Sequence, residues 1–372
     1  MAELKLLNVY ANFYRGRRVL VTGHTGFKGT WLVTWLLKLG ADVAGYSIDI
    51  PSIPSNFELL GLCHRLRHYQ GDIRNNSRLS EVIDEFRPEI IFHLAAQALV
   101  RRSYIDPVTT FETNVMGMVC LLDCVRQRPW IEVAVLITSD KAYRNKEWCW
   151  GYRETDVLAG KDPYSGSKSC ADLVAYSYFH SYLGGGPTSI AIARAGNVIG
   201  GGDWAEDRIV PDCIRSWSKS QATLIRSPKA TRPWQHVLEP LSGYLTLAER
   251  LWHKHVGING EAFNFGPDVQ VDQTVEQLLM EMQKNWPDGQ WYIPEGHELG
   301  GHEAMLLRLS CDKALSYLNW RPTLDFKDTV AFTVDWYRAW RSGYVDMYLF
   351  TLTQIEHYCE IANKRKISWI TN

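Results

Sequence analysis

The chain has 372 residues, which is ample for a packed core, so one large domain or two interleaved domains are expected. Forty basic and 41 acidic residues give a formal charge of −1, and no Lys/Arg block indicates a nucleic-acid partner. No stretch approaches the roughly 20 apolar residues of a membrane span and no secretory signal is evident, so a cytoplasmic protein without a membrane partner is expected.

Short apolar runs alternate with segments of helical period through the first 270 residues. The run at 17–23 ends in glycine and precedes a helical pattern that closes at Gly40. Further strands are predicted at 41–47, 89–95, 132–138, 189–195 and 261–266, and helices at 79–86, 111–126, 164–182 and 236–254. This alternation predicts an α/β fold, a Rossmann-type doubly wound parallel sheet.

After residue 199 the pattern gives way to loops rich in Gly, Pro and Trp, with helical stretches at 273–285 and 325–341. Because these loops are interleaved with sheet elements, we expect the second domain to be discontinuous. The expected regions are a first, Rossmann-type domain (1–198, with segments near 236–268 returning to it), a second, smaller domain (199–235 and 269–345) and a C-terminal extension (346–372).

The first chemical motif is the glycine-rich segment "VTGHTGFKG", which follows a strand and opens a helix. Glycines are needed where the chain turns tightly and where backbone amides approach a pyrophosphate at a helix N-terminus. This context favours dinucleotide binding over an ordinary loop. Lys28 is expected near the phosphates or in solvent. The candidate cofactor residues of this turn are Gly23, His24, Gly26, Phe27, Lys28 and Gly29.

The next candidates concern the adenosine half of the cofactor. An acid about 20 residues past the last glycine binds the ribose of NAD, and Asp49 stands at that spacing, although Ser47 occupies the predicted strand end. No Arg in "YSIDI" favours a 2′-phosphate, so NAD is preferred to NADP. In "GDIR", Asp72 and Ile73 would meet the adenine, or else they begin a capped helix.

The nicotinamide half is expected to lie after the strand at 89–95. Ala95 and Ala96 are small residues where the backbone must pass close to a cofactor, and Gln97 would face the nicotinamide. The eight cysteines show no C-x-x-C pair and no zinc-type Cys/His cluster, so free thiols and no metal are expected.

Tyr164 and Lys168 are four residues apart in a predicted helix and therefore lie one above the other. A nearby ammonium favours the phenolate, so Lys168 is expected to lower the pKa of Tyr164. Tyr164 could then take the proton of a sugar hydroxyl while the attached carbon is oxidised by NAD. Ser139, at the end of the strand at 132–138, completes this set.

The segments "VTGHTGFKG", "HLAAQ", "TSDKAYRN", "DPYSGSK" and "ARAGNVIGGGDWAEDRIVPD" together resemble the extended short-chain dehydrogenase/reductase family, the NAD-dependent epimerases and dehydratases. The resemblance runs from about residue 17 to about 345. Within the family, Asp140 and Lys141 beside Ser139 resemble the 4,6-dehydratases of nucleotide sugars. The members that act on dTDP-glucose carry Thr-Asp-Glu where this chain has Ser139-Asp140-Lys141.

The resemblance implies a dehydration in three parts. Tyr164, aided by Ser139 and Lys168, removes the C4 hydroxyl proton while C4 is oxidised. Asp140 then protonates the C6 hydroxyl while Lys141 removes the C5 hydrogen, which requires a protonated Asp140 and a neutral Lys141. Finally C6 is reduced and C5 is reprotonated. The alternative for Asp140 and Lys141 is a surface ion pair.

The resemblance also implies the substrate and the assembly. Asn197, Arg208, Arg232 and Arg308 are candidates for binding a sugar-nucleotide diphosphate, because arginine suits bidentate phosphate recognition. CDP-glucose is implied by the resemblance alone, as is a bacterial pathway to 3,6-dideoxyhexoses of surface lipopolysaccharide O-antigen. The helices at 111–126 and 164–182 could pair with a second copy in a homodimer or homotetramer.

Two other functions remain open from the sequence. A nucleotide-sugar 4-epimerase would share the glycines and the Tyr/Lys pair, but it has little use for Asp140 and Lys141. An NAD-binding regulator without chemistry would have no need of Ser139, Tyr164 and Lys168.

Overall fold

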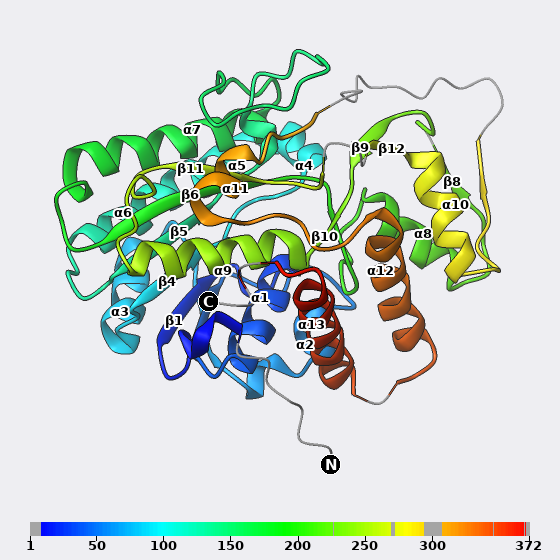
Figure 1. Ribbon diagram of the computed structural model, residues 1–372, viewed down its shortest axis with the longest axis horizontal. Helices are drawn as coiled ribbons and strands as arrows, with labels where there is room; N and C mark the ends of the chain where they lie inside the picture. The colour runs from blue at the N-terminus through cyan, green and yellow to red at the C-terminus, as the bar shows by residue number, and fades with distance from the viewer. Residues whose placement is uncertain are drawn as a thin grey trace.

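The computed structural model describes residues 9–225, 227–268, 272–293, 307–344, 346–367 and 369. Within them, one sheet of seven parallel strands runs in the order β11-β6-β5-β4-β1-β2-β3 (Figure 1). Its strands are β1 (Arg18–Thr22), β2 (Asp42–Ser47), β3 (Arg67–Gln70), β4 (Ile90–His93), β5 (Val133–Ile137), β6 (Ser189–Ala195) and β11 (Ala262–Phe265). The predicted doubly wound α/β fold is confirmed.

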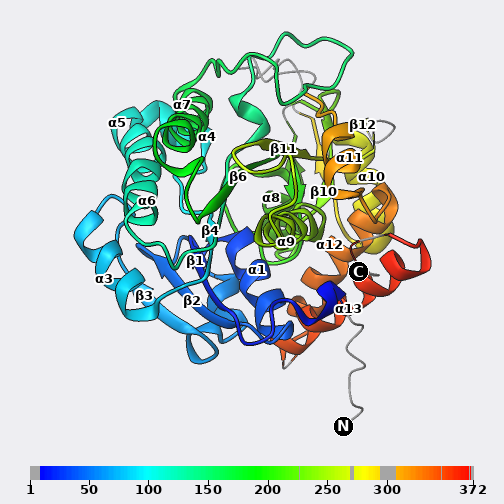
Figure 2. The same ribbon diagram turned by 60° about the vertical axis from the view of Figure 1, so that its left-hand side comes forward.

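Alternating side chains of the central strands build two separate cores. Val19 and Val21 of β1 face one side of the sheet and pack with Trp31 and Trp35, whereas Leu20 faces the other side. Figure 2 shows the two helical layers. The first layer contains α1 (Phe27–Lys38) and α9 (Leu238–Trp252), and the second contains α3 (Asn76–Phe86), α6 (Gly117–Arg126) and α7 (Pro163–Tyr178).

The strand order reverses direction at β1, which lies between β2 and β4. Thr22 at the end of β1 is in register with His93 at the end of β4. In open parallel sheets, ligands bind outside the carboxyl ends of the strands at such a switch point. The segments that follow β1, β4, β5 and β6 therefore define the edge of the sheet where a site is expected.

The remaining described elements are short or lie beside the sheet. They are η1 (Val9–Asn12), α2 (Asn56–Leu59), η2 (Leu62–His64), α4 (Val100–Ile105), α5 (Pro107–Phe111), η3 (Glu112–Met116), η4 (Asp140–Ala142), η5 (Phe179–Leu183), β7 (Val198–Ile199), α8 (Ile209–Trp217), β8 (Thr223–Leu224), β9 (Thr231–Pro233), β10 (Gln235–His236), β12 (Asp272–Thr274), α10 (Val275–Asn285), β13 (Trp291–Tyr292), α11 (Asp312–Leu318), α12 (Phe326–Arg341) and α13 (Met347–Lys364). The predicted domain boundaries stay a prediction.

The C-terminal segment, for which no structure was predicted, packs back onto the first helical layer. Helix α13 lies against α1, and Tyr358 on it stacks on Trp369, with ring centroids 5.6 Å apart. Trp369 in turn stacks on Tyr10, at 5.8 Å. Both ends of the described chain are therefore held by one aromatic cluster over α1.

One helical stretch, Pro107–Arg126, is long and apolar enough to cross a membrane by length and composition alone. The sequence-based expectation did not anticipate this stretch. It is weak evidence for a span, because a core helix of a soluble protein passes the same test and 44% of its apolar window is buried inside the molecule. Its inner face packs on α3 and α7.

Candidate active site

The glycine-rich turn joins β1 to α1, and two of its glycines are required by packing. Gly23 has a φ of +73°, and a Cβ atom there would lie 2.7 Å from the backbone nitrogen of Ala95. A Cβ atom on Gly29 would lie 2.2 Å from the carbonyl oxygen of Gly23, so the helix start presses directly on the turn.

Gly26, between them, is less tightly packed. It is the N-cap of α1 without a side-chain cap, and a Cβ atom there would meet only the Gly23 carbonyl, at 3.4 Å. The amides of the first helical turn have no partners within the helix. Uncapped amides at a helix N-terminus fit a pyrophosphate, so the residues present suit a dinucleotide.

NAD-binding proteins of this fold usually carry an acid near the end of the second strand, where it hydrogen-bonds the adenosine ribose. At the end of β2 this chain has a network of histidine side chains instead. The His24 ring lies over Gly45, donates to or accepts from Ser47 Oγ at 2.9 Å, and hydrogen-bonds His68 Nδ1 at 2.8 Å. Burial, with His68 adding to it, lowers the pKa of His24 to about 3, so the ring is neutral. Asp49 lies two residues beyond the strand with an exposed side chain, and its carbonyl accepts from Thr25 Oγ1 at 2.7 Å.

The candidate adenine loop follows β3. Arg74 binds the carboxylate of Asp72 through its Nη2 at 2.7 Å, and this hydrogen bond lowers the pKa of Asp72. Tyr46 Oη donates to the Asp72 carbonyl at 2.9 Å, and Ile73 is buried. Asp72 therefore orders the loop through Arg74, and its role toward adenine stays a prediction.

The segment after β4 brings Ala95 against the glycine turn, and Ala96 follows it. The backbone nitrogen of Ala95 donates to Thr22 Oγ1 at 3.2 Å. Both N–H groups of the Gln97 side-chain amide donate within the protein, to Thr110 Oγ1 at 2.9 Å and to the Leu99 carbonyl at 3.1 Å, and its contact with a nicotinamide stays a prediction. The amide thus holds its own loop in place.

Ser139, Asp140 and Tyr164 come together at the carboxyl ends of β5 and β6. Ser139 caps the short helix η4, and its hydroxyl accepts from the Lys141 nitrogen at 3.2 Å and donates to Asp140 Oδ1 at 3.0 Å. Tyr164 lies close enough for Ser139 to act on the pKa of its phenol. The exposed fractions of Ser139, Asp140 and Tyr164 are 6%, 2% and 9%, which excludes the alternative of a surface ion pair for Asp140.

The carboxylate of Asp140 rests on a glycine that follows β6. A Cβ atom on Gly196 would lie 1.9 Å from Asp140 Oδ2. A side chain at position 196 would therefore displace the Asp140 carboxylate, whose position depends on the glycine. Lys141 follows in the same short helix and is less buried, and its protonation state stays a prediction.

The effect expected of Lys168 on Tyr164 does not appear. Burial raises the pKa of Tyr164, while the Ser139 hydrogen bond and the Arg208 charge oppose that rise and the Asp140 charge adds to it. Burial also lowers the pKa of Lys168 to about 8, with the Asp172 charge opposing. Desolvation outweighs the attraction assumed from helical spacing, because both groups lie inside the molecule rather than on a helix surface.

Lys28, Asp203 and Arg208 add further charges to this site. The sequence alone did not indicate that these residues lie together. Burial lowers the pKa of Lys28 to about 8; the charges of Arg208 and Lys168 act in the same direction, and those of Asp140 and Asp203 oppose it. Arg208 forms an ion pair with Asp203 at 2.7 Å. The Lys28 ammonium is therefore within electrostatic range of Asp140, Lys168 and Arg208, and its side chain is partly buried.

The other substrate candidates lie in two places. Asn197, beside Gly196, has a left-handed φ of +49°, and its buried Nδ2 has no hydrogen-bond partner in the structure. Arg308 lines a cavity of about 210 Å³ together with Trp150, and Arg232 directly precedes Pro233, another lining residue. Asn197 thus adjoins the glycine that packs on Asp140, and the charge of Arg208 acts on Tyr164, whereas Arg308 lines this cavity and Arg232 is next in sequence to a residue that does.

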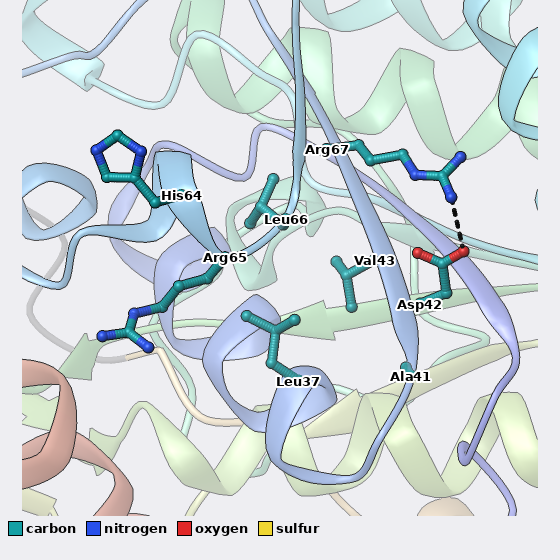
Figure 3. A pocket seen from close by; sticks show the side chains of 8 residues that line it. All are labelled: Leu37, Ala41, Asp42, Val43, His64, Arg65, Leu66 and Arg67. Atoms are coloured by element: carbon teal, nitrogen blue, oxygen red, sulfur yellow. Dashed lines mark hydrogen bonds and ion pairs between the residues drawn. The ribbon is translucent and has the colours of Figure 1, made fainter.

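A larger groove, of about 300 Å³, lies away from these residues (Figure 3). It is lined by residues of the end of α1, the start of β2 and the segment before β3, and the Arg67–Asp42 ion pair lies at one side of it. This is the opposite end of the strands from the catalytic residues, so it has no part in the site. Among the described residues, no three His, Cys, Asp or Glu side chains gather to hold a metal ion.

Comparisons with known proteins agree with the motif resemblance. The family described as GDP-mannose 4,6 dehydratase matches residues 20–333. The CDP-glucose 4,6-dehydratase of Salmonella typhimurium is 47% identical over 352 residues, which cover 93% of this chain and 97% of that one.

Solved structures share the fold at lower identity. The dTDP-glucose 4,6-dehydratase of Bacillus anthracis, solved in complex with NAD, has a TM-score of 0.72 at 22% identity and covers 89% of this chain and all of its own. The UDP-glucose 4-epimerase of Thermotoga maritima, solved with UDP-glucose, has a TM-score of 0.74 at 21% identity and covers 86% of this chain and 98% of its own. The matched length and the 47% relative show that this chain belongs to the GDP-mannose 4,6 dehydratase family, within the extended short-chain dehydrogenases/reductases.

Proposed function

We propose that this chain is an NAD-dependent dehydratase that converts CDP-D-glucose into CDP-4-dehydro-6-deoxy-D-glucose and water. The observation that carries the proposal is the buried carboxyl of Asp140, which accepts a hydrogen bond from Ser139 beside Tyr164. Epimerisation at C4 has no use for an acid at this position, whereas expulsion of a C6 hydroxyl requires one. The 47% relative, which matches over 97% of its own length, supports the nucleotide and the sugar.

The cofactor would lie across the carboxyl ends of the strands. Gly23, Gly26 and Gly29 would receive its pyrophosphate at the start of α1, and Asp49 and Asp72 would contact its adenosine half. When bound, NAD would take a hydride from C4 of the sugar and return it to C6. His24, Phe27, Lys28, Ile73, Ala95, Ala96 and Gln97 complete the proposed cofactor-binding set.

The first proton transfer is assigned to Tyr164. In its phenolate form Tyr164 takes the proton of the C4 hydroxyl, and the Ser139 hydroxyl is assigned to orient the sugar hydroxyl. Because burial raises the pKa of Tyr164, cations must stabilise the phenolate during catalysis. Arg208 already acts in that direction, and Lys168 lies one helical turn away on α7.

The elimination is assigned to Asp140 and Lys141. Once C4 is a ketone, the C5 hydrogen is acidic and a neutral Lys141 can remove it. Asp140 in its protonated form gives its proton to the C6 oxygen, the C6–O bond breaks, and water leaves. The ammonium of Lys141 later returns a proton to C5 when C6 is reduced.

Substrate binding is assigned to two groups of residues. Asn197 and Arg208 lie near the sugar, and the unpartnered Nδ2 of Asn197 is suited to an oxygen of the ligand. Arg232 and Arg308 would bind the diphosphate from the neighbouring cavity. In this arrangement residues 1–198 carry the cofactor and 199–235 with 269–345 carry the nucleotide sugar.

We also infer a cytoplasmic homo-oligomer that supplies a deoxysugar pathway for surface polysaccharide. The helices around α5, η3 and α7 support a dimer, because they expose Val108, Phe111, Met116, Leu173 and Tyr176 on their outer faces.

The test is mass spectrometry of the product after incubation with NAD and CDP-glucose, with UDP-glucose and dTDP-glucose in parallel. Loss of one water from CDP-glucose alone, without accumulation of NADH, is the expected result. An unchanged mass with altered sugar stereochemistry would indicate a 4-epimerase instead. A Tyr164→Phe variant should lose the dehydratase activity. An NAD-binding regulator without chemistry would instead work unchanged after the same substitution.

A further inference from the structure

Gln235 is a buried glutamine that lies beside the catalytic edge of the sheet. It begins the short strand β10, which pairs with β7 directly after the turn at Gly196 and Asn197. Only 1% of the surface of Gln235 is exposed. None of the proton and hydride transfers proposed above uses this residue, so its place beside the site needs another explanation.

The side-chain nitrogen of Gln235 joins the ends of two neighbouring strands. Its Nε2 atom donates to the carbonyl of Gly196 at 2.9 Å and to the carbonyl of Phe265 at 3.0 Å. Gly196 follows β6, Phe265 ends β11, and Ala195 with Phe265 forms the last register pair of these strands. Gln235 therefore ties the two strands together at the point where their own pairing stops.

The main chain of Gln235 holds the same turn. Its backbone nitrogen donates to the carbonyl of Asn197 at 3.2 Å, so one residue binds two successive carbonyl groups, those of Gly196 and Asn197. Asn197 has a left-handed φ of +49°, which is uncommon for a residue with a side chain. The bonds from Gln235 therefore stabilise a turn whose backbone conformation is unusual.

The orientation of the Gln235 amide follows from its neighbours. A flipped amide would point its oxygen at two carbonyl oxygens, so the nitrogen must face them. The amide oxygen is then buried, and within the described part of the chain it has no hydrogen-bond partner. Burial of an unpaired oxygen is unfavourable, and an apolar side chain would avoid it. The two bonds from Nε2 are therefore what the amide contributes at this position.

The turn that Gln235 holds is also the one that supports Asp140. The Asp140 carboxylate packs on Gly196, where an added Cβ atom would lie 1.9 Å from Oδ2. The Cα atom of Gly196 is bonded to the carbonyl carbon that Gln235 holds, so a shift of this carbonyl would move the surface on which the carboxylate rests. Tyr164 belongs to a different element, α7, and the same shift should leave it in place.

We propose that Gln235 is a positioning residue that places the Asp140 carboxylate for the loss of water, by holding the turn at Gly196 and Asn197. This inference rests on the proposed function and divides the reaction into two parts. Oxidation at C4, which is assigned to Tyr164, does not depend on Gln235. Delivery of a proton to the C6 oxygen, which is assigned to Asp140, does depend on it.

The test uses Gln235→Met, which keeps an unbranched side chain and removes both N–H groups. In single turnovers with NAD and CDP-glucose, C4 should be oxidised within about twofold of the wild-type rate, while water is lost on the order of tenfold more slowly. Reduced nicotinamide and the 4-keto intermediate should therefore accumulate before product appears. Absorbance of the reduced cofactor and rapid quench with mass spectrometry measure the two steps. The wild type should show no such accumulation.

Gln354→Met is the matched control. Gln354 is also a buried glutamine whose Nε2 donates to a backbone carbonyl, that of Phe332 at 2.7 Å, but it lies on α13. Denaturant unfolding should show a loss of stability in both variants, but Gln354→Met should not accumulate reduced nicotinamide. Gln235→Met should also slow water loss less in a Gly196→Ala background than in the wild type, because both changes displace the same carboxylate.

The inference would be overturned if Gln235→Met slowed oxidation and water loss equally, or if Gln354→Met gave the same accumulation. If Gln235→Met does not fold, Gln235→Glu takes its place. A glutamate has the same shape but at most one side-chain donor, so it cannot bind both carbonyls. A smaller accumulation is then expected, and its absence would contradict the inference. A wild-type protein that does not dehydrate CDP-glucose would instead refute the proposed function itself.

Discussion

The position of the Asp140 carboxylate depends on a glycine, Gly196, that lies 56 positions further along the sequence. The carboxylate lies against the backbone of Gly196, and a methyl group there would overlap it. The two residues follow neighbouring strands, β5 and β6, which places them at the same edge of the sheet. The position of the proposed acid is therefore set by strand order and by glycine together.

Gly196→Ala tests that dependence. The added methyl group should displace Asp140, so dehydration should slow by about 10²-fold or more, the usual contribution of a general acid. Gly185→Ala is the matched control, since a Cβ atom at Gly185 has nothing within 4 Å. Product formation and the thermal midpoint should be measured for both variants. Full activity in Gly196→Ala would mean that the carboxylate position is not critical.

Lys28 gives a prediction for pH. Its pKa is lowered by burial from 10.5 to about 8, so between these values the unfolded chain binds more protons than the folded one. The contribution of Lys28 therefore makes the wild-type protein more stable as pH rises from about 8 to 10.5. Lys28→Met removes this contribution.

Lys28→Met should thus be more stable than the wild type at pH 7, and the difference should shrink as pH rises through that window. Denaturant unfolding at a series of pH values measures it, with Lys28→Arg as the variant that keeps the charge. A stability difference that does not change with pH would contradict the burial of this ammonium.

At the scale of elements, the glycines in the turn between β1 and α1 have two different roles. Gly23 and Gly29 are required by contacts within the protein, whereas Gly26 meets no atom closer than 3.4 Å. A glycine without an internal packing reason, at the uncapped start of a helix, is suited to the approach of a ligand.

Gly26→Ala should therefore fold with a change in unfolding free energy of about 0.5 kcal/mol or less. Its affinity for NAD should nevertheless fall, because the methyl group occupies the space proposed for the pyrophosphate. Gly29→Ala should lose stability by about 1–3 kcal/mol, since its Cβ atom would overlap the Gly23 carbonyl. Calorimetric titration with NAD and denaturant unfolding distinguish the two. Unchanged NAD affinity in Gly26→Ala would argue against this cofactor position.

The elements themselves were largely predictable, because β-branched runs and helical periods are local signals. The predicted strand at 132–138 and the helix at 164–182 correspond to β5 and to α7 with η5, and the pairing of Ser139 with Tyr164 follows from them. The charges around Lys28 could not be predicted as a group, since Asp203 and Arg208 are more than 170 residues away along the chain. The hydrogen bonds of His24 with Ser47 and His68 likewise depend on how β1, β2 and β3 lie side by side.

At the scale of the whole molecule, the outer faces of α5, η3 and α7 are unusually apolar for a surface. Val108, Phe111, Met116, Leu173 and Tyr176 have exposed fractions between 39% and 67%. Figure 2 shows α5, α6 and α7 together on one side of the molecule, and the helices also pack on one another. Exposed apolar side chains on helices that pack together are suited to association with a second copy.

Leu173→Glu should convert a dimer into a monomer, because it places a charge in the middle of that surface. Val256→Glu is the control, since Val256 is almost fully exposed in the loop after α9. Sedimentation velocity at several protein concentrations measures the mass of each variant. A Leu173→Glu protein that keeps the mass of the wild type would place the interface elsewhere.

The central claim is that oxidation at C4, loss of water and reduction at C6 occur within one site built around Ser139, Asp140 and Tyr164. The most direct measurement uses CDP-glucose carrying deuterium at C4, with the product examined by NMR and mass spectrometry. We predict that the product has lost one water and carries the deuterium at C6. A product of unchanged mass, or one without deuterium at C6, would contradict this account.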